Sequence, residues 1–382
     1  MSQTLRPVVG IIGGGQLARM LHAASIGLGV DVRLLAEGPA TSAAQVISDV
    51  TVGDYTDRDT VVSFAAGCDV VTFDHEHVPT DFLRELEAVG VAVRPGPDAL
   101  VHAQDKAIMR ARLTAAGFPC PAFRVVQTPQ ELADFGDEIG WPIIAKTARG
   151  GYDGKGVWKL SGPDDVAQVF ALTSANVVAE EFVDFTRELS ALVARSPAGQ
   201  AVAYPVSESV QRNGICVETT TPAPGLADDA AASIQALALS VARELGVVGL
   251  LAVELLQRAD GAIVINELAM RPHNTGHWSI DGAATSQFEN HLRAVLDLPL
   301  GEPTPRAGWT VMANVLGGSR TDLFAGLEHC FAHDRGLRVQ LYGKDVVPGR
   351  KVGHVTCLGE DLEATRHRAR HAAAYLMGAT DE

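Results

Sequence analysis

The segment Glu267-Leu-Ala-Met-Arg-Pro-His-Asn-Thr-Gly-His-Trp278 begins with a carboxylate at the end of an apolar run and continues as a dense polar stretch. A second carboxylate, Glu254, ends an earlier apolar run. The turn Ala259-Asp-Gly261 between them predicts a hairpin whose two strands carry the carboxylates side by side. Such a pair suits a hard divalent cation, Mg²⁺, that carries phosphates. The first hypothesis is chemistry that couples nucleotide phosphates to a second, anionic substrate.

Two other interpretations of this region remain open. The carboxylates could act as a general acid and base, although nothing near them in the sequence indicates a proton acceptor. His273 and His277 are potential zinc ligands. No cysteine or third histidine is spaced to complete a tetrahedral site, so the sequence favours Mg²⁺ over zinc.

The composition is that of a globular protein. The chain has 382 residues, 47% hydrophobic and 20% charged, which is enough for two or three domains with sizeable cores. No apolar run approaches the roughly 18 residues that cross a bilayer, and we expect neither a membrane partner nor a secretory signal. Five scattered cysteines predict reduced thiols in a cytoplasmic protein. The net charge of −15 argues against nucleic-acid binding, although local cations can still hold anionic substrates.

The chain alternates strand and helix patterns in its first third. Strands are expected at 8–12, 30–35 and 69–73 and a helix at 16–28, which predicts a parallel sheet with crossover helices. Another helix is expected over 104–118, ending at Gly117. The rest of the chain divides into a small α+β unit around a glycine-rich loop at 123–194, a larger α+β unit at 201–300, and short strands with a final helix at 309–382.

Gly13-Gly-Gly-Gln-Leu-Ala18 follows the first expected strand and opens a helix. Glycines there let backbone N–H groups approach a phosphate at the positive end of the helix. The spacing also matches G-x-G-x-x-A, and Glu37 ends the next strand, as in dinucleotide sites. The sequence leaves open a mononucleotide-like phosphate, a dinucleotide, or a tight structural turn.

Arg149-Gly-Gly-Tyr-Asp-Gly-Lys-Gly156 contains four glycines in eight residues. Such a loop can fold over phosphates and donate N–H hydrogen bonds. A β-hairpin turn is the alternative, although Tyr152 and Asp153 would be unusual choices for it. Lys146 ends the preceding strand and is expected to meet a phosphate.

Other candidates are spread along the chain. The strand Val177-Val-Ala-Glu-Glu-Phe-Val183 can hold adenine through backbone groups and an acidic side chain, and Glu188 can accept hydrogen bonds from a ribose. Glu76 follows a parallel strand, at the end of the sheet that ligands favour. Pro348-Gly-Arg-Lys-Val-Gly-His354 places two cations in a turn that can clamp a phosphate or carboxylate. Ordinary surface or strand-end positions are the alternative in each case.

These motifs together resemble the N5-carboxyaminoimidazole ribonucleotide synthetases, ATP-grasp enzymes of purine biosynthesis. The similar segments are, in order, Gly13-Gly-Gly-Gln-Leu17, Gly150-Gly-Tyr-Asp-Gly-Lys-Gly156, Asn266-Glu-Leu-Ala269, Arg271-Pro-His-Asn-Thr-Gly-His-Trp278, Gln287-Phe-Glu289 and Pro348-Gly-Arg-Lys-Val-Gly-His354. The resemblance implies an α/β and α+β fold: a Rossmann-like domain at 1–104, an ATP-grasp lid at 105–190, a large subdomain with the Mg²⁺ site at 191–300, and a β-rich extension at 301–382.

The resemblance also implies the ligands of the candidate residues and a homodimer. ATP would contact Lys106, Lys146, Gly151, Tyr152, Asp153, Gly154, Lys155, Gly156, Val157, Glu180, Glu181, Phe182, Val183, Glu188, Gln211, Asn266 and Glu267. The substrate 5-aminoimidazole ribonucleotide would contact Gly15, Gln16, Leu17, Glu76, Tyr152, Asp153, Lys155, Arg271, His273, Asn274, Arg350 and Lys351. Tyr152, Asp153, Lys155, Arg271 and His273 would be catalytic, and Glu254 and Glu267 would hold Mg²⁺.

The implied reaction begins with attack of bicarbonate on the γ-phosphate of ATP, while Mg²⁺ and lysines offset the charge. The product would be carboxyphosphate, and the 5-amino group of the ribonucleotide would take up its carboxyl directly or after release of CO₂. Closure of the glycine loop would keep water from the anhydride. No protein nucleophile is needed.

The sequence departs from the usual family pattern at a few positions. Met270 replaces a proline, Thr275 replaces a serine, and Phe73-Asp-His-Glu-His77 replaces Tyr-Glu-Phe-Glu-Asn. Gln211 stands where some members have a histidine. These departures concern details of substrate contacts and leave the implied reaction unchanged.

Three other functions are weighed against this one. A related ATP-grasp enzyme, such as a formate-using glycinamide ribonucleotide enzyme, is disfavoured by His273-Asn-Thr-Gly-His-Trp278. An NAD-dependent oxidoreductase built on residues 8–37 leaves the two carboxylates and the glycine-rich loop without a role. A binding module without activity would not need the full set of candidate residues.

Overall fold

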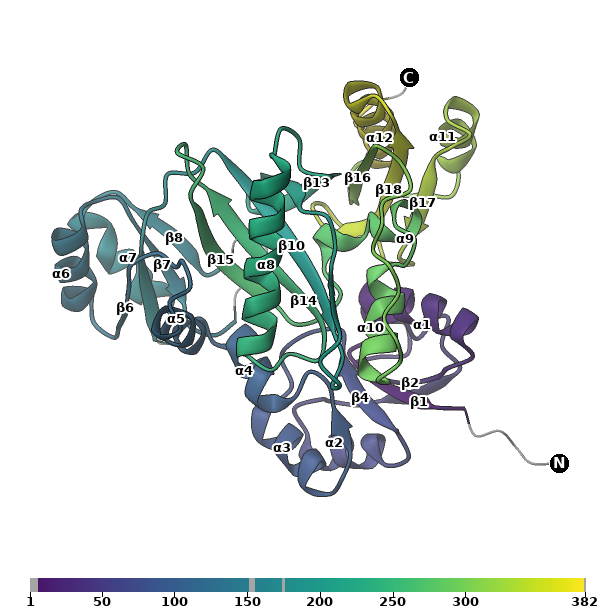
Figure 1. Ribbon diagram of the computed structural model, residues 1–382, viewed down its shortest axis with the longest axis horizontal. Coiled ribbons are helices and arrows are strands. Elements are labelled where there is room, and N and C mark those ends of the chain that lie inside the picture. The colour runs from purple at the N-terminus through teal and green to yellow at the C-terminus, as the bar shows by residue number, and fades with distance from the viewer. Residues whose placement is uncertain (1–5, 151–154, 174–175, 381–382) are drawn as a thin grey trace.

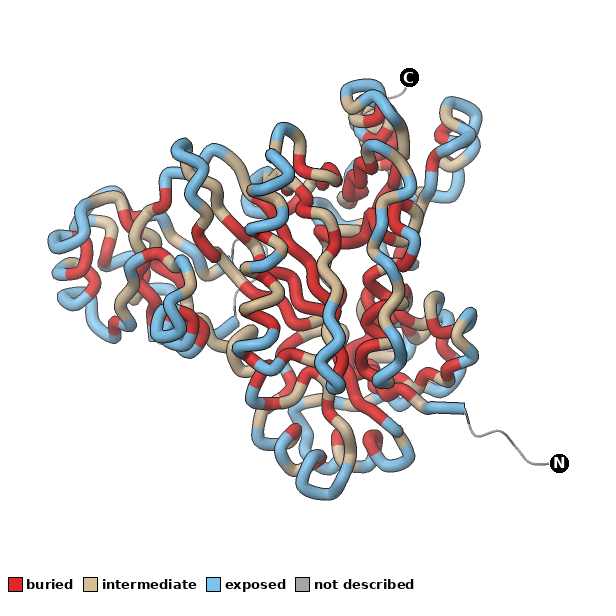
Figure 2. Tube along the Cα trace, viewed as in Figure 1, coloured by how far each residue is buried: buried red, intermediate tan, exposed pale blue. Residues whose placement is uncertain are grey.

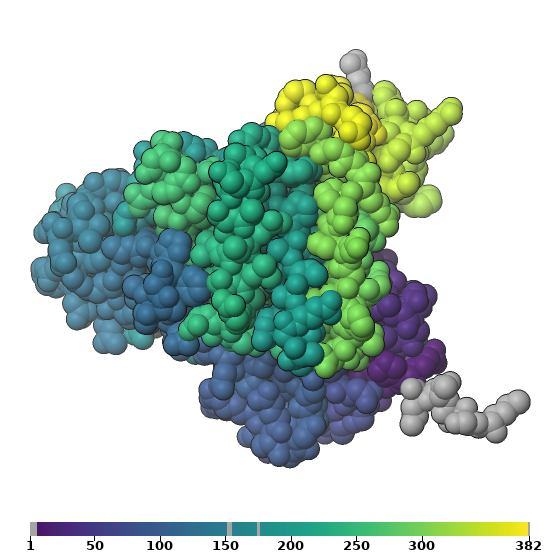
Figure 3. Space-filling model, in the orientation of Figure 1, coloured from purple at the N-terminus to yellow at the C-terminus, as the bar shows by residue number. Residues whose placement is uncertain are grey.

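The computed structural model describes residues 6–150, 155–173 and 176–380, which form three β-sheets flanked by helices. The nine-stranded sheet lies centrally, between the N-terminal sheet and a lobe built on the four-stranded sheet (Figure 1). In the space-filling view this lobe, coloured blue, projects from the rest of the molecule (Figure 3). Within the described ranges, no helix combines the length and apolarity needed to cross a membrane.

The N-terminal sheet is parallel throughout, in the order β3-β2-β1-β4-β5. Its strands are β1 (Val8–Ile12), β2 (Asp31–Ala36), β3 (Asp49–Val52), β4 (Val70–Phe73) and β5 (Ala92–Val93). Its helices are α1 (Gln16–Leu28), α2 (Arg58–Ala65), α3 (Thr80–Ala88) and α4 (Pro97–Gln104). The central strands are apolar because a parallel sheet is buried on both faces. The expected parallel sheet and the helix at 16–28 are confirmed.

Close packing shapes the glycine turn before α1. A Cβ on Gly15 would lie 2.0 Å from Asp74 Oδ2, so no side chain fits there. Asp74 Oδ1 accepts a hydrogen bond of 2.7 Å from the Ala18 N–H, which is one of the unpaired donors at the start of the helix. Glu37 Oε2 accepts a hydrogen bond of 3.0 Å from the Gly14 N–H. Both carboxylates therefore support the turn itself.

The four-stranded sheet is antiparallel, in the order β6-β9-β7-β8. Its strands are β6 (Phe123–Val126), β7 (Ile143–Thr147), β8 (Val157–Leu160) and β9 (Val177–Glu181). The helical elements of this lobe are α6 (Pro129–Ile139), η1 (Pro163–Asp165) and α7 (Val166–Leu172). Lys146 in β7 pairs with Val157 in β8, so the glycine-rich loop joins the two strands of a hairpin.

The expectation of one helix over 104–118 is wrong at its start. The helix α5 spans Lys106–Ala115, and Asp105 separates it from α4. The Asp105 carboxylate accepts hydrogen bonds from the N–H groups of Ala107 (3.0 Å) and Ile108 (3.2 Å), and so forms the N-cap of α5. An N-cap aspartate has extended backbone, which ends the preceding helix.

The nine-stranded sheet contains strands from the middle and from the end of the chain. Its strands are β10 (Arg187–Arg195), β11 (Ala201–Ala203), β12 (Ser207–Arg212), β13 (Ile215–Thr221), β14 (Gly249–Gln257), β15 (Ile263–Ala269), β16 (Trp309–Leu316), β17 (Arg338–Leu341) and β18 (Lys351–Gly359). Its helices are α8 (Asp228–Glu244), η2 (Asn274–Gly276), α9 (Ser279–Gly282), α10 (Gln287–Val295), α11 (Leu327–His333) and α12 (Leu362–Met377). β16 pairs with β13, so the C-terminal strands extend the central sheet.

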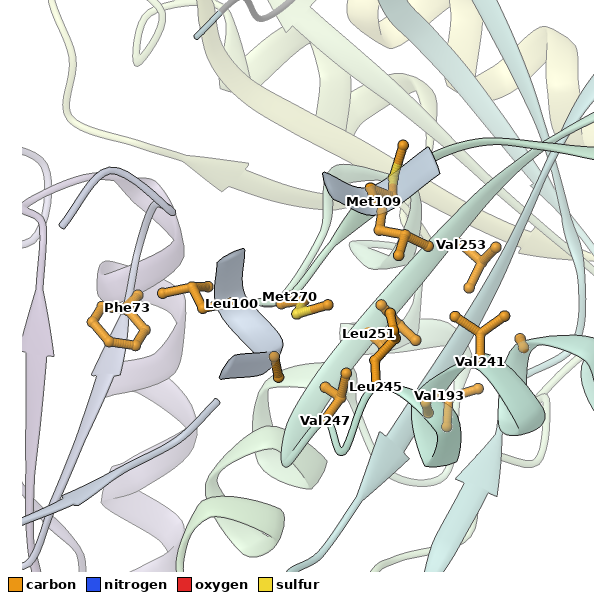
Figure 4. Close-up of a cluster of buried hydrophobic side chains, with 14 of the residues drawn as sticks. Phe73, Leu100, Met109, Val193, Val241, Leu245, Val247, Leu251, Val253 and Met270 are labelled. Atoms are coloured by element: carbon orange, nitrogen blue, oxygen red, sulfur yellow. The ribbon is translucent and has the colours of Figure 1, made fainter. Parts of the chain in front are cut away.

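One apolar core joins the N-terminal sheet to the central sheet. It includes Phe73 in β4, Leu100 in α4 and Val253 in β14, and Figure 4 shows Met270 between the two parts. Each of these side chains is at most 1% exposed. Figure 2 shows many buried segments gathered where the two sheets meet. This burial fixes the position of the N-terminal sheet relative to β14 and β15.

His291 in α10 bridges the same two sheets. Its Nδ1 accepts a hydrogen bond of 3.1 Å from the Leu250 N–H, and its Nε2 lies 2.8 Å from Thr72 Oγ1. Because Nδ1 is the acceptor, Nε2 carries the ring proton and donates to the hydroxyl. The ring is fully buried, and this burial lowers the pKa of His291 to about 3.

Lowering the pH from 7.5 to 5 should reduce the free energy of unfolding by about 2 kcal/mol through His291. Its folded-state pKa lies below the ordinary value of 6.5, so between pH 6.5 and 3 the unfolded chain binds the proton and the folded chain does not. The contribution to stability is therefore complete above pH 6.5 and is lost as the pH falls. Urea unfolding at both pH values measures the difference. A pH dependence that is equally steep in His291→Gln would contradict the assignment.

Candidate active site

A cavity of about 1460 Å³ is lined by residues from all three sheets. Most of the residues that the sequence singled out line it: Gln16, Leu17, Glu76, Lys106, Lys146, Lys155, Val157, Glu180, Glu181, Phe182, Val183, Glu188, Gln211, Glu254, Asn266, Glu267, Arg271, His273, Asn274, Arg350 and Lys351. Gly15 and Gly156 are not among its lining residues. Gly151, Tyr152, Asp153 and Gly154 lie outside the described residues, so their expected contacts stay predictions.

The two carboxylates face each other across the hairpin of β14 and β15. Glu254 pairs directly with Glu267 in the strand register, which confirms the expected hairpin. Glu254 Oε1 lies 3.2 Å from His273 Nε2, and Glu267 Oε1 lies 3.0 Å from Lys106 Nζ. Burial, followed by the like charge of Glu267, raises the pKa of Glu254. Two paired carboxyl groups at a cavity wall are a suitable oxygen donor set for a divalent cation.

The Lys146 side chain bridges the lobe and the central sheet. Its Nζ lies 2.8 Å from Glu180 Oε2 and donates a hydrogen bond of 3.1 Å to Asn266 Oδ1. Asn266 precedes Glu267 in β15, so the lysine reaches the carboxylate pair from the end of β7. Lys146 thus lies between an acidic side chain of its own lobe and an amide of the central sheet.

Arg110 is a functional neighbour that the sequence did not reveal. It lies in α5, is fully buried, and its Nε donates a hydrogen bond of 2.6 Å to Glu180 Oε1. Its other nitrogens donate to the carbonyl groups of Ile265 (2.9 Å) and Asn266 (2.6 Å). Burial opposes the charge of Glu180, but the attraction of Lys146 and Arg110 outweighs it and lowers the pKa of Glu180. This network holds β9 against β15.

Arg110→Met should lower the free energy of unfolding by roughly 3–5 kcal/mol, because it leaves a buried carboxylate short of its main partner. Arg112→Met is the matched control on the same helix. Arg112 is half exposed and pairs with Glu244, and such pairs contribute at most about 1 kcal/mol. Urea unfolding of both variants measures the two changes in the free energy of unfolding. Equal decreases would show that the buried ion pair stabilises the protein no more than the exposed one.

The acids of the expected adenine-binding strand are paired with cations from other elements. Glu180 is held by Arg110 and Lys146, and Glu181 is held by Arg258 and by the Ala122 N–H at 3.2 Å. Both acids line the cavity together with Phe182 and Val183, and the expected contacts of this strand with adenine stay a prediction.

Glu188 and Gln211 lie together on neighbouring strands of the central sheet. Burial raises the pKa of Glu188, and a hydrogen bond from Gln211 partly opposes this rise. Gln211 Nε2 also donates to Ser209 Oγ at 3.0 Å. Both side chains line the cavity, so Glu188 is not a surface glutamate.

The other end of the cavity lies at the carboxyl ends of β1 and β4, where the parallel sheet changes direction of winding. Gln16 follows β1, and Glu76 follows β4. Glu76 Oε2 accepts a hydrogen bond of 2.8 Å from Arg271 Nε, and its Oε1 accepts one of 3.3 Å from the Met270 N–H. Glu76 thereby orients the arginine that follows the carboxylate hairpin.

Lys344 adds a cation that the sequence did not single out. Its Nζ donates a hydrogen bond to Gln16 Oε1, and it lines the cavity with Arg350 and Lys351. Burial lowers the pKa of Lys344, while Asp74 partly restores it. Its position a few residues before the turn Pro348–His354 was the available signal.

His277 contributes a buried donor or acceptor to the same wall. Its Nδ1 lies 3.1 Å from Gln287 Nε2, and its Nε2 has no hydrogen-bond partner among the described residues. Burial lowers the pKa of His277 well below the ordinary value. A buried ring nitrogen without a partner at a cavity wall is suited to a ligand contact.

The chain matches three families of domains in succession. Residues 7–104 match the ribonucleotide synthetase preATP-grasp domain, residues 111–288 the ATP-grasp domain, and residues 310–368 the phosphoribosylaminoimidazole carboxylase C-terminal domain. These matches follow the order of the N-terminal sheet, the lobe with the central sheet, and the C-terminal strands.

Known proteins resemble the chain over nearly its whole length. N5-carboxyaminoimidazole ribonucleotide synthase of Mycobacterium tuberculosis is 52% identical over 97% of this chain and 88% of its own. The carboxyaminoimidazole ribonucleotide synthase of Aspergillus clavatus solved with ATP has a TM-score of 0.90 and 31% identity, covering 97% of this chain and 98% of its own. The same enzyme solved with ADP and 5-aminoimidazole ribonucleotide has a TM-score of 0.89 and 30% identity, with the same coverage.

Identity at this level over both chains is far above what a shared fold alone would require. The order of the matched domains and the positions of the cavity residues agree with it. The chain belongs to the N5-carboxyaminoimidazole ribonucleotide synthase family, and its fold is an ATP-grasp fold with a preATP-grasp domain and a C-terminal extension.

Proposed function

We propose that the protein catalyses the ATP- and bicarbonate-dependent carboxylation of 5-aminoimidazole ribonucleotide to N5-carboxyaminoimidazole ribonucleotide, with release of ADP and phosphate. It is thus an ATP-dependent carbon–nitrogen ligase of purine biosynthesis. The observation that carries the proposal is one cavity with two differently equipped ends. Phe182, Val183 and Lys146 of the lobe line its first end, and Gln16 and Glu76 line its second. Arg271 and Lys351 lie near enough to Glu254 to favour its charged form.

The first end suits ATP. The backbone at Phe182 and Val183 is available to adenine, and Glu188 can accept hydrogen bonds from ribose hydroxyls. Lys106 lies 3.0 Å from Glu267, and Lys146 lies 3.1 Å from the side-chain oxygen of Asn266. Both lysines therefore reach the carboxylate hairpin, where they would contact the phosphates. The described end of the glycine-rich loop, Lys155 with Val157, lines the same space.

Glu254 and Glu267 would hold Mg²⁺, with the side-chain oxygen of Asn266 close by. The bound ion supplies positive charge that offsets the charge on the transferring phosphoryl group. The residues around it then have separate tasks. Lys106 and Lys146 bind phosphate oxygens, and His273 orients the Glu254 carboxylate through the contact at 3.2 Å.

The second end suits the ribonucleotide. Gln16 and Glu76 lie at the switch point of the parallel sheet, and Arg271 is oriented by Glu76. Arg350 directly precedes β18 and Lys351 is its first residue, and both provide positive charge for the 5′-phosphate. These groups position the 5-amino nitrogen toward the γ-phosphate end of the cavity.

The reaction requires two transfers and no protein nucleophile. A bicarbonate oxygen attacks the γ-phosphorus, the bond to the β-phosphate oxygen breaks, and ADP leaves, which gives carboxyphosphate. The 5-amino nitrogen then bonds to the carboxyl carbon as phosphate leaves, and the nitrogen loses a proton. A closed, positively charged cavity stabilises both anions and excludes water from the anhydride.

The structure bears on the alternative functions. Glu37, which a dinucleotide site would direct to a ribose, accepts a hydrogen bond from the Gly14 N–H and lies 3.4 Å from His75. An oxidoreductase built on residues 8–37 would also leave the carboxylate pair unused.

We further propose a cytoplasmic homodimer with domains at 1–104, 105–190, 191–300 and 301–382. Light scattering during gel filtration measures the dimer.

Release of ADP from ATP and Mg²⁺ with bicarbonate, measured with and without 5-aminoimidazole ribonucleotide, tests the proposed function. We expect ADP formation that depends on the ribonucleotide, together with an equal amount of carboxylated product. ADP formation that is indifferent to the ribonucleotide, but responds to another amine, would assign a different ligase reaction to this site.

A further inference from the structure

Four histidines lie on the two helices near the C-terminus, and none of them lines the active-site cavity. His329 and His333 belong to α11, and His367 and His371 belong to α12. Each pair is spaced four residues apart, so both side chains leave the same face of their helix. The two helices lie close together at the C-terminal end of the molecule (Figure 1).

The ring nitrogens of three of these histidines converge. His329 Nε2 and His371 Nε2 are 3.2 Å apart, and the ligand nitrogens of His329, His333 and His371 all lie within 4.8 Å of one another. In a tetrahedral zinc site with Zn–N bonds near 2.0–2.1 Å, ligand nitrogens are roughly 3.3 Å apart. The ring nitrogens of His329 and His371 already have about this separation. Small rotations of the side chains would bring the His333 nitrogen to a similar distance from both.

The surrounding residues orient these rings. Tyr375 stacks on His329 with ring centroids 3.6 Å apart and an angle of 6° between the planes. The guanidinium carbon of Arg320 lies 4.2 Å from the centroid of the Tyr375 ring.

We propose that His329, His333 and His371 bind a divalent transition metal ion, with Zn²⁺ as the preferred ion, and thereby fasten α11 to α12. Imidazole donors select zinc, nickel or copper over the hard ions Mg²⁺ and Ca²⁺. No carboxylate belongs to this group within the part of the chain that the structure describes. The ring centroid of His367 lies 6.4 Å from that of His371, so His367 or water can supply a fourth ligand.

The metal would stabilise α11, a short helix that buries few of its side chains against the rest of the protein. Helix α11 has seven residues, and Cys330 is its only fully buried one. Phe331, in the middle of the helix, is 45% exposed. A metal bond between α11 and α12 would therefore supply much of the attachment that apolar contacts do not.

The test uses the full chain, from which metal is removed with EDTA. The protein is then dialysed against Zn²⁺ in the presence of excess Mg²⁺ and ADP, which occupy the catalytic cavity. We expect one tightly bound zinc ion per chain. His329→Gln and His371→Gln should each weaken binding by more than about 100-fold, because even groups that only support a ligand contribute 10–100-fold. His102→Gln, which removes an imidazole from α4, is the matched control and should bind zinc normally.

A second readout does not depend on the folding of the variants. With Co²⁺ in place of zinc, the unaltered chain should show the intense visible bands of a four-coordinate ion. ADP formation by the His329→Gln and His371→Gln variants should remain normal. Zinc affinity that is equal in the unaltered chain and in the His329→Gln and His371→Gln variants, or a weak six-coordinate Co²⁺ spectrum, would show that the histidines only stack on one another.

Discussion

Replacing Glu267 with glutamine should lower the rate of ADP formation by roughly 10³-fold or more while leaving the fold intact. The substitution removes the negative charge of one of the two paired carboxylates. It therefore weakens the binding of Mg²⁺ beside the phosphates. It also leaves Lys106 without the acid that lies 3.0 Å away. The measurement is the rate of ADP release with saturating ATP, bicarbonate and ribonucleotide over a range of Mg²⁺ concentrations.

A surface glutamate provides the control for this prediction. Glu363 in α12 has a side chain that is 77% exposed, and Glu363→Gln should keep full activity. Both variants should unfold at the same temperature as the unaltered protein, since neither substitution disturbs the apolar core. Normal turnover of Glu267→Gln would refute the assignment of Glu267 to the metal site.

Replacing Arg271 with alanine should raise the KM for the ribonucleotide by roughly 10- to 100-fold and change the KM for ATP little. This range corresponds to the loss of charge-assisted hydrogen bonds worth about 1.5–3 kcal/mol. Arg271 lines the cavity and is held by Glu76, which follows β4 of the N-terminal sheet. Initial rates with each substrate varied in turn separate the two constants.

Two further variants show whether geometry or charge matters at this position. Arg271→Lys keeps the charge but loses the fork that binds Glu76 and an anion at once, so it should restore only part of the affinity. Glu76→Gln weakens the orientation of the arginine and should raise the same KM to a smaller extent. Equal increases of both KM values in Arg271→Ala would instead place the residue in the ATP site or in general folding.

Local patterns in the sequence predicted much of the fold. Helix α1 spans the expected residues because its apolar positions repeat with helical period and the glycines before it allow a tight turn. The hairpin that carries Glu254 and Glu267 was predictable because both strands and the turn between them are contiguous in the chain. The helix break at Asp105 was missed because an aspartate also fits the polar face of a continuous helix.

Contacts between distant residues were beyond the reach of local patterns. Nothing near Arg110 in the sequence shows that its guanidinium is fully buried against Glu180 and two carbonyl groups of β15. The same applies to Lys344, whose partner Gln16 lies in the first helix. The cations that pair with the acids at 180 and 181 also lie in other elements, so the sequence did not reveal these pairs.

Transfer of labelled oxygen from bicarbonate to phosphate tests the proposed chemistry most directly. The enzyme is given ¹⁸O-labelled bicarbonate, ATP, Mg²⁺ and 5-aminoimidazole ribonucleotide, and the phosphate product is analysed by mass spectrometry. Because a bicarbonate oxygen bonds to the γ-phosphorus, we expect one labelled oxygen in each phosphate released with ADP. Phosphate without the label, formed together with the carboxylated product, would contradict attack of bicarbonate on ATP at this site.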